Sequence, residues 1–135
     1  MKNYNFERKA SDLLALLGNP FRIQIILTIG EGEACVCHLE TALNKRQAYI
    51  SQHLMALRDG GILETRREGK YIFYRLSNPK VFELIRAAGL LAGVQEKDLP
   101  MLQIPLQVNK CVCPYCEGEI PMFEKKLHSV VPENE

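Results

Sequence analysis

The sequence lacks any apolar run long enough for a membrane-spanning helix. The five apolar residues at 13–17 form one of its longest such runs, whereas about 20 residues are needed to cross a bilayer. Residues 1–12 also lack the apolar stretch that a secretory signal requires. We therefore expect a cytoplasmic protein, in which cysteines bind metals or react as thiols rather than form a disulfide framework.

The sequence also lacks the residue sets of common enzyme mechanisms. It has no recognisable Ser/His/Asp set, no pair of carboxylates arranged for acid–base catalysis and no glycine-rich phosphate loop. Internal repeats and low-complexity tracts are absent too. From the missing catalytic sets we do not expect an enzyme. A length of 135 residues, with 47% hydrophobic and 24% charged residues, indicates one ordinary globular domain with an appendage.

Charge is nearly balanced over the whole chain but not along it. The formal net charge is +1, yet residues 44–75 hold seven basic and three acidic residues, so this stretch carries +4 and the remainder −3. A local basic patch on a near-neutral chain is typical of a surface that binds nucleic acid. An ordinary solvated face would give the same count, so charge alone leaves both interpretations open.

Hydrophobic periodicity and capping residues predict five helices and one hairpin. Asn19-Pro20 supplies an N-cap and a first-position proline for a helix that ends at Gly30. Glu68-Gly69 joins two alternating stretches into a β-hairpin, because glycine tolerates the positive φ of the turn. The expected helices are 7–17, 20–29, 37–43, 46–59 and 79–92, the expected strands are 62–67 and 70–76, and a connector occupies 31–36.

Two short helices, a tight turn at Asn44-Lys45 and a hairpin follow the order of a winged helix-turn-helix domain. The predicted fold class is therefore mainly α with a β-hairpin wing. In the helix over 46–59, Ile50, Leu54 and Leu57 are spaced to face the core, so the opposite face suits the major groove and the cationic wing suits phosphates. The residues expected to face DNA are Gln47, Ala48, Tyr49, Ser51, Gln52 and Met55 on the helix and Arg66, Arg67, Lys70 and Arg75 on the wing.

Over residues 13–76 the chain resembles the ArsR/SmtB metalloregulators. The likeness rests on LLALLGNPFRIQIIL, EACVCHLETAL and YISQHLMALRDGGILETRREGKYIFYRL, in that order. It implies a homodimeric repressor, joined through its first and last helices, that binds operator DNA. It adds His53 to the DNA-facing residues, although a packing histidine fits that position equally well. Ala48 departs from the hydroxyl residue that is usual at its position.

Cys35 and Cys37 lie where the connector meets the predicted third helix. Inside a helix, residues i and i+2 point about 200° apart and do not share one ion. At the start of a helix the first cysteine is still extended, so both sulfurs can turn to the same side. A helix N-terminus favours the thiolate form, and thiolates select soft ions. Two small buried residues that pack the start of a helix are the structural alternative.

The resemblance identifies this CVC sequence as the metal-sensing motif of the family. Glu40 stands where some arsenic sensors have a third cysteine, so two thiolates need further ligands from elsewhere. The other common metal site of the family uses Asp and His on the last helix. Residues 79–92 contain neither, so we discount an ion there.

A second cysteine cluster, Cys111, Cys113 and Cys116, follows a predicted arm. Cys113-Pro-Tyr-Cys116 resembles half of a zinc knuckle, and Cys35 and Cys37 of the same chain or of a partner are candidates for the other half. CPYC is also the active-site string of glutaredoxins, but too few residues follow it for that fold. A reactive tail that holds no metal is a further alternative.

These observations predict two segments and one leading function. Residues 1–93 are expected to form a winged helix-turn-helix DNA-binding and dimerisation domain, and residues 94–135 a C-terminal arm with a Cys-rich, knuckle-like tail. The leading hypothesis is a homodimeric repressor that leaves its operator when its thiolates capture As(III), Cd(II), Pb(II) or Zn(II). The alternatives are a thiol redox or persulfide sensor of the same fold and a DNA-binding protein with a purely structural zinc tail.

Overall fold

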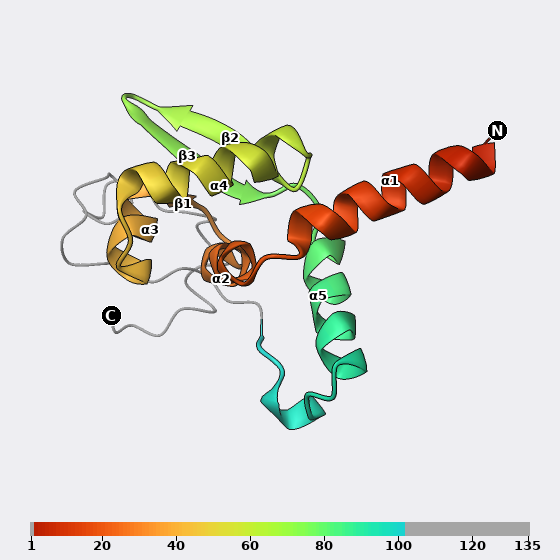
Figure 1. Cartoon of the computed structure of the whole chain (residues 1–135). Helices are drawn as coiled ribbons and strands as arrows, with labels where there is room; N and C mark the ends of the chain where they lie inside the picture. Colours follow the sequence, from red (N-terminus) through yellow and green to blue (C-terminus); the bar gives the residue numbers. More distant parts are fainter. Residues whose placement is uncertain (1, 102–135) are drawn as a thin grey trace.

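The structure is a computed structural model that describes residues 2–101, with side chains from residue 5 onward. This part of the chain forms five α-helices and one three-stranded antiparallel sheet (Figure 1). In chain order the elements are α1 (Lys2–Leu17), α2 (Pro20–Ile29), β1 (Ala34–Cys35), α3 (Val36–Leu43), α4 (Gln47–Asp59), β2 (Leu63–Glu68), β3 (Tyr71–Leu76), α5 (Lys80–Leu91) and the 3-10 turn η1 (Glu96–Asp98).

The predicted helices are confirmed, and their ends follow the expected local signals. The Asn19 side chain caps α2 by accepting hydrogen bonds from the backbone N–H groups of Phe21 and Arg22, which satisfies two donors that the first turn leaves without partners. Gly30 ends α2 at a φ of 57°, a conformation that favours glycine. At the N-terminus α1 begins five residues earlier than the apolar pattern indicated.

The core forms where α2, α3 and α4 pack against the base of the sheet. Ile50, Leu54 and Leu57, the residues spaced to face inward on α4, are all 0% exposed, which confirms the expected orientation of that helix. They meet the buried face of α2 and Leu39 of α3 in one apolar cluster. The opposite face of α4 is therefore left at the surface.

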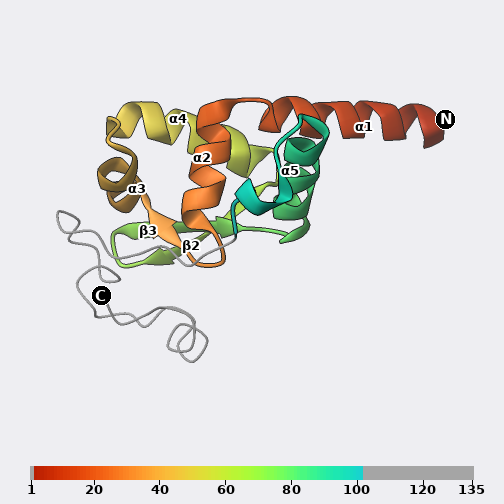
Figure 2. The same ribbon diagram turned by 90° about the horizontal axis from the view of Figure 1, so that it is seen from below.

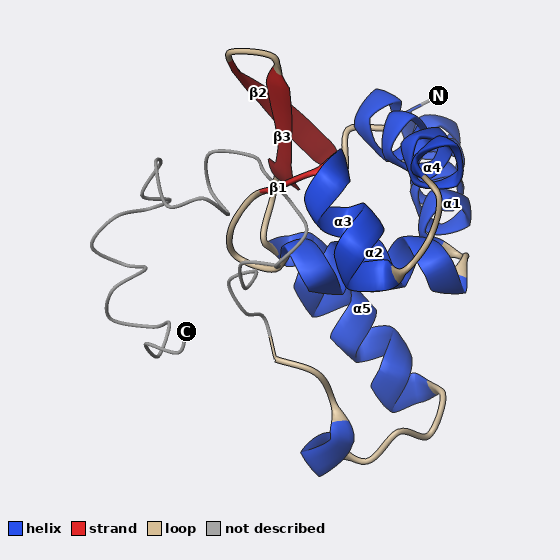
Figure 3. Ribbon diagram, turned by 90° about the vertical axis from the view of Figure 1, so that its left-hand side faces the viewer, coloured by secondary structure: helices blue, strands red, loops and turns tan. Residues whose placement is uncertain are grey.

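The sheet contains a strand that the sequence did not predict. The connector includes β1, whose two residues pair with β3 in the register Ala34↔Tyr74 and Cys35↔Phe73, giving the strand order β1-β3-β2. Two residues are too few to show an alternating pattern, so only the tertiary pairing defines this strand. Figure 3 shows the β2–β3 hairpin standing away from the helices, as a wing does.

The predicted turn of the hairpin is wrong by one residue. Glu68 stays in the ladder opposite Tyr71, so the two-residue turn is Gly69-Lys70 instead of Glu68-Gly69. Gly69, with a φ of 62°, takes the first central position, where a primed turn requires a positive φ. The correction moves Lys70 to the tip of the wing.

Helices α1 and α5 expose apolar side chains. The N-terminal half of α1 projects from the rest of the domain (Figures 1 and 2). Phe6 and Leu14 of α1 are 69% and 55% exposed, and Leu91 of α5 is 90% exposed. An apolar groove of about 580 Å³ runs between these helices and α2. The exposed side chains and the groove together make a larger apolar surface than scattered single residues would, and a surface of this kind is typical of an interaction face.

The chain turns back after α5, within the predicted arm. Gly93, at a φ of 99°, lies at this turn, Leu99 is buried beside Gly89, and Arg86 donates a hydrogen bond to the carbonyl oxygen of Pro100. The arm therefore lies against the domain as far as residue 100. The proposed boundary at residue 93 stays a prediction.

Among residues 2–101, no single helix is long and apolar enough to cross a membrane, and the only combination that passes by length and composition is the pair Asn5–Leu17 and Pro20–Ile29, bent by 83°.

Candidate functional site

A tight turn places α4 at the surface after α3. Asn44 ends α3 in the left-handed conformation, with φ 56° and ψ 50°, which asparagine tolerates better than most residues. Seven residues of α4 were placed toward DNA, six by the helix pattern and His53 by the resemblance alone. Five of them are exposed and two, Ser51 and His53, are half-buried; the exposed ones are Gln47, Ala48, Tyr49, Gln52 and Met55.

The wing separates two arginines that are adjacent in the sequence. Side chains alternate across a strand, so Arg66 and Arg67 lie on opposite faces of β2. Arg67 and Lys70 are exposed, and an Nη atom of Arg67 donates to the carbonyl oxygen of Gly69 near the tip. These two cations are free of carboxylate contacts within the described residues, so they are available to phosphates.

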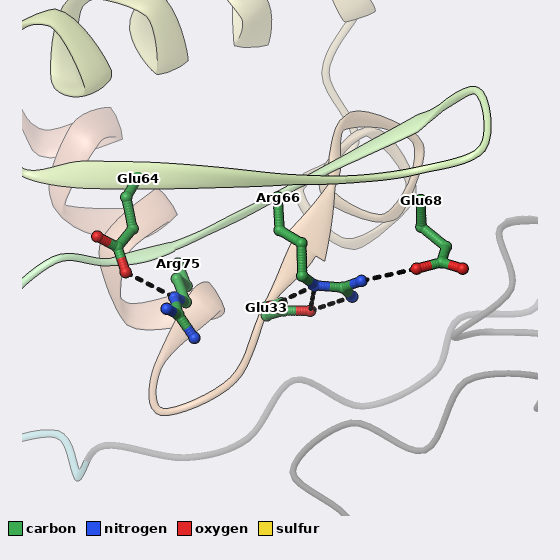
Figure 4. A network of polar contacts seen from close by, with 5 residues as sticks. All are labelled: Glu33, Glu64, Arg66, Glu68 and Arg75. Carbon is green, nitrogen blue, oxygen red and sulfur yellow. Dashed lines mark hydrogen bonds and ion pairs between the residues drawn. The ribbon is translucent and has the colours of Figure 1, made fainter.

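Arg66 instead joins the wing to the start of β1. Its Nε and Nη atoms donate three hydrogen bonds, of 2.6–3.2 Å, to the carboxylate of Glu33 (Figure 4). The Glu33 side chain is only 6% exposed, and the hydrogen bonds that Arg66 donates to Glu33 raise the pKa of Arg66. The guanidinium also lies 4.8 Å from the ring centroid of Phe73, the residue paired with Cys35. Arg66 was predicted to face DNA, but in this geometry its positive charge is paired with the carboxylates of Glu33 and Glu68.

His53 is held against α2 rather than extended from α4. Its Nδ1 accepts a hydrogen bond from Nε of Arg22 at 3.0 Å, and its ring contacts those of Phe21 and Tyr49, which also contact each other. Burial, and then the charge of Arg22, lower the pKa of His53. The ring is therefore packed and neutral, yet it still borders the surface of α4.

The two cysteines of the CVC motif occupy different environments. Cys35 is the N-cap of α3, in an extended conformation with φ −92° and ψ 170°, and its Sγ accepts a hydrogen bond from the backbone N–H of His38 at 3.4 Å. It is 3% exposed. Cys37 is half-buried and lines an open depression with Glu40 and the residues of the turn before α4. The expected extended conformation of the first cysteine is confirmed, and neither thiol forms a disulfide within the described residues.

These residues fit part of a soft-ion site. The donors are two sulfurs at a helix N-terminus, one of them accessible from a surface depression. Among residues 2–101, no group of three or more His, Cys, Asp and Glu side chains is placed to hold a metal ion. Cys111, Cys113 and Cys116 lie outside the described residues, so the predicted sharing of an ion stays a prediction.

Three residues that the sequence analysis did not single out contact the candidate functional residues. Arg22 hydrogen-bonds to His53, Glu33 to Arg66, and the backbone N–H of His38 to the sulfur of Cys35. Glu33 is one of two acids in a connector, and Arg22 lies on a helix whose apolar residues face the core, so neither has a local signature. The one available signal was the alternation of side chains along the hairpin. It places Arg66 and Arg67 on different faces, so it indicated that the two arginines have different partners.

The helix-turn-helix, its exposed second helix and the cationic hairpin define a winged helix-turn-helix DNA-binding protein. A sequence profile of the bacterial regulatory proteins of the arsR family matches residues 19–65. The chain is 41% identical over 96 residues to the biofilm growth-associated repressor of Agrobacterium fabrum, spanning 69% of this chain and 82% of that protein. The chain belongs to the ArsR family.

Two further relatives bear on ligand and assembly. The arsenical resistance operon repressor of Escherichia coli is 47% identical over 66 residues, which are 48% of this chain and 56% of that protein. The homodimeric winged helix-turn-helix DNA-binding domain of a Mycobacterium bovis protein superposes with a TM-score of 0.60 at 29% identity, covering 66% of this chain and 82% of that one. The fold expected from the sequence is thereby confirmed.

His38 should make the stability of the domain fall in mild acid. The side chain is 1% exposed, and burial lowers its pKa from 6.5 to about 4. The unfolded chain takes up this proton first as the pH falls, so stability is lost between pH 6.5 and 4, by about 3 kcal/mol in total. We expect urea unfolding at pH 7 and pH 5 to show a smaller pH effect in H38Q than in the wild type. Equal pH dependence in the two proteins would contradict the assignment.

Proposed function

We propose that this chain is a transcriptional repressor that binds operator DNA as a homodimer and is released when Cys35 and Cys37 capture a soft ion such as As(III), Cd(II), Pb(II) or Zn(II). The observation that carries the proposal is the position of Cys35. It is the last residue of β1, which pairs with the wing, and it is the N-cap of α3, the helix directly before α4. A change at its sulfur therefore acts on both DNA-binding elements.

The chemistry of the donors favours a thiophilic ion. Thiolates select soft metals and metalloids, and Cys37 is the sulfur that the depression beside α3 leaves accessible. Trivalent arsenic takes three thiolates, whereas CVC offers two. We infer that one or more of Cys111, Cys113 and Cys116 complete the set. The likeness to an arsenical resistance operon repressor makes arsenite the first ion to test.

Release follows if capture changes the hydrogen bonding of Cys35. Its sulfur now accepts the His38 N–H and so helps to set the direction in which α3 begins. A sulfur that turns toward an ion gives up this contact, which shifts the start of α3 and the strand paired with Phe73. A preference of a few kcal/mol for the shifted state lowers operator affinity by one to about three powers of ten.

The exposed apolar face of α1 and α5 fits a second copy of the chain. Phe6, Leu14 and Leu91 lie on it, and the related Mycobacterium bovis domain is homodimeric. A two-fold dimer presents two α4 helices, which must lie about 34 Å apart to enter successive major grooves. The domain is therefore expected to bind an imperfect palindrome.

The two parts of the DNA surface should differ in what they recognise. With an operator selected from random duplexes, Q52A should reduce the preference for that operator over unrelated DNA, because Gln52 faces the groove. R67Q should weaken binding to all duplexes alike and flatten the salt dependence by about one unit, as loss of a phosphate contact does. R75Q is the control on the same hairpin, because it removes a cation that is already held in an exposed ion pair with Glu64. A stable monomer without duplex affinity at low salt would refute the DNA-binding proposal.

Replacing the CVC sulfurs should uncouple DNA binding from the ion. Serine is a good N-cap, so C35S should keep the start of α3 and its fold. We expect C35S, C37S and the double variant to bind operator as the wild type does, but to stay bound when arsenite or Cd(II) is added, as followed by fluorescence anisotropy. Normal release of the double variant would show that these cysteines only pack. Release by a thiol oxidant alone, with no response to any ion, would favour a redox sensor instead.

Removing the tail cysteines should weaken the ion response. A chain that ends at Leu106, and a full-length variant with Ser at 111, 113 and 116, should both keep operator affinity. Both should need at least about tenfold more arsenite for release, since they leave only two thiolates. An unchanged arsenite titration would make the tail an independent appendage.

A further inference from the structure

Arg22 connects three helices through one side chain. Its Nε donates to Nδ1 of His53 on α4 at 3.0 Å, and an Nη atom donates to the carbonyl oxygen of Leu16 in the last turn of α1 at 3.1 Å. Its own backbone N–H is capped by Asn19 at the start of α2. A cation is favoured at the C-terminal end of a helix, so the contact with α1 is stabilising. The arginine thus joins the expected dimerisation helix to the recognition helix.

The same contact determines which nitrogen of His53 carries the proton. Every guanidinium nitrogen is a donor and stays protonated, so Nδ1 must present its lone pair to Arg22. A neutral imidazole has one N–H, which is then on Nε2. The pKa of His53 is lowered by burial and by Arg22, in agreement with a neutral ring. His53 is therefore a donor on the side of the ring away from α2.

The packing of the ring limits what this donor can reach. Ring centroids of Phe21 and Tyr49 lie 5.4 and 4.8 Å from that of His53, and Arg22 holds its Nδ1, so the ring is packed beside α2 rather than extended from α4. The neighbouring Gln52 is exposed, and its flexible side chain is long enough to extend into the groove. A short, fixed, neutral donor on the flank of a recognition helix suits an oxygen of the DNA backbone rather than a base edge.

We propose that Arg22 is a positioning residue for operator binding: it fixes His53 so that Nε2–H donates a hydrogen bond to a backbone phosphate. The inference needs only that the chain binds DNA through α4, and it does not depend on ion sensing. Because the donor is neutral, the contact releases no counterion. It should therefore contribute to affinity without adding to the salt slope.

Two isosteric variants of His53 test the assigned nitrogen. A glutamine places its NH2 group near the position of Nε2, whereas an asparagine reaches only the position of Nδ1. We expect H53N to lower operator affinity about tenfold, as loss of a hydrogen bond to a charged group does, and H53Q to recover most of that loss. Both measurements use the metal-free full chain and a salt titration, with thermal melting and sedimentation as checks on folding and dimer state.

Variants of Arg22 test the positioning role. R22Q should lower affinity to the level of H53N. The double variant R22Q/H53N should bind no more weakly than either single variant, because the two single substitutions remove the same contact with the phosphate. R86Q is the matched control, since Arg86 also donates to a carbonyl oxygen but from α5; it should leave affinity unchanged. If R22Q does not fold, the Asn and Gln variants at position 53 still decide the proposal, because they leave the contact with Leu16 intact.

Three results would overturn the proposal. Equal affinity of H53N and H53Q would show that Nε2 makes no contact with DNA. A salt slope reduced by about one unit in R22Q would show that Arg22 itself binds a phosphate. Additive losses in the double variant would show that the two residues act separately.

Discussion

The whole arrangement depends on one residue that belongs to two elements. Cys35 ends a strand whose partner is the wing and caps the helix that leads into the recognition helix. A backbone held at both sides in this way cannot move on one side alone, because close-packed interiors transmit small displacements instead of absorbing them. The sulfur proposed to capture the ion is thus at the junction of the two parts proposed to contact DNA.

The ion pair between Glu33 and Arg66 makes this junction stiffer. Backbone pairing joins β1 to β3, while the fork of Arg66 joins the residue before β1 to β2. An ion pair this well hydrogen-bonded offsets the cost of burying Glu33, whereas removing one partner would leave a buried charge uncompensated. The pair therefore connects the start of β1 to the wing, and it holds the charge of Arg66, a residue expected at phosphates, against a carboxylate of the protein itself.

The sequence was most informative where the signals are local. The helices follow from apolar spacing and from caps such as Asn19, and the buried residues of α4 follow from period alone. Strand β1 could not be predicted, because two residues carry no pattern and form a strand only when β3 is beside them. The Arg22–His53 and Glu33–Arg66 contacts join residues 31 and 33 positions apart, and one sequence gives no signal for such pairs.

Ion pairs within the protein reduce the number of basic residues that are available to DNA phosphates. Of the seven basic residues in 44–75, Arg58, Arg66 and Arg75 form ion pairs with carboxylates. The exposed cations that remain are Lys45 and Arg46, which precede α4, and Arg67 and Lys70 near the tip of the wing. Positive charge is thus concentrated at two ends of the surface, with the uncharged side chains of α4 beside it. Phosphate contacts at both ends would set the register of the duplex, while the uncharged face of α4 would decide which sequence is bound.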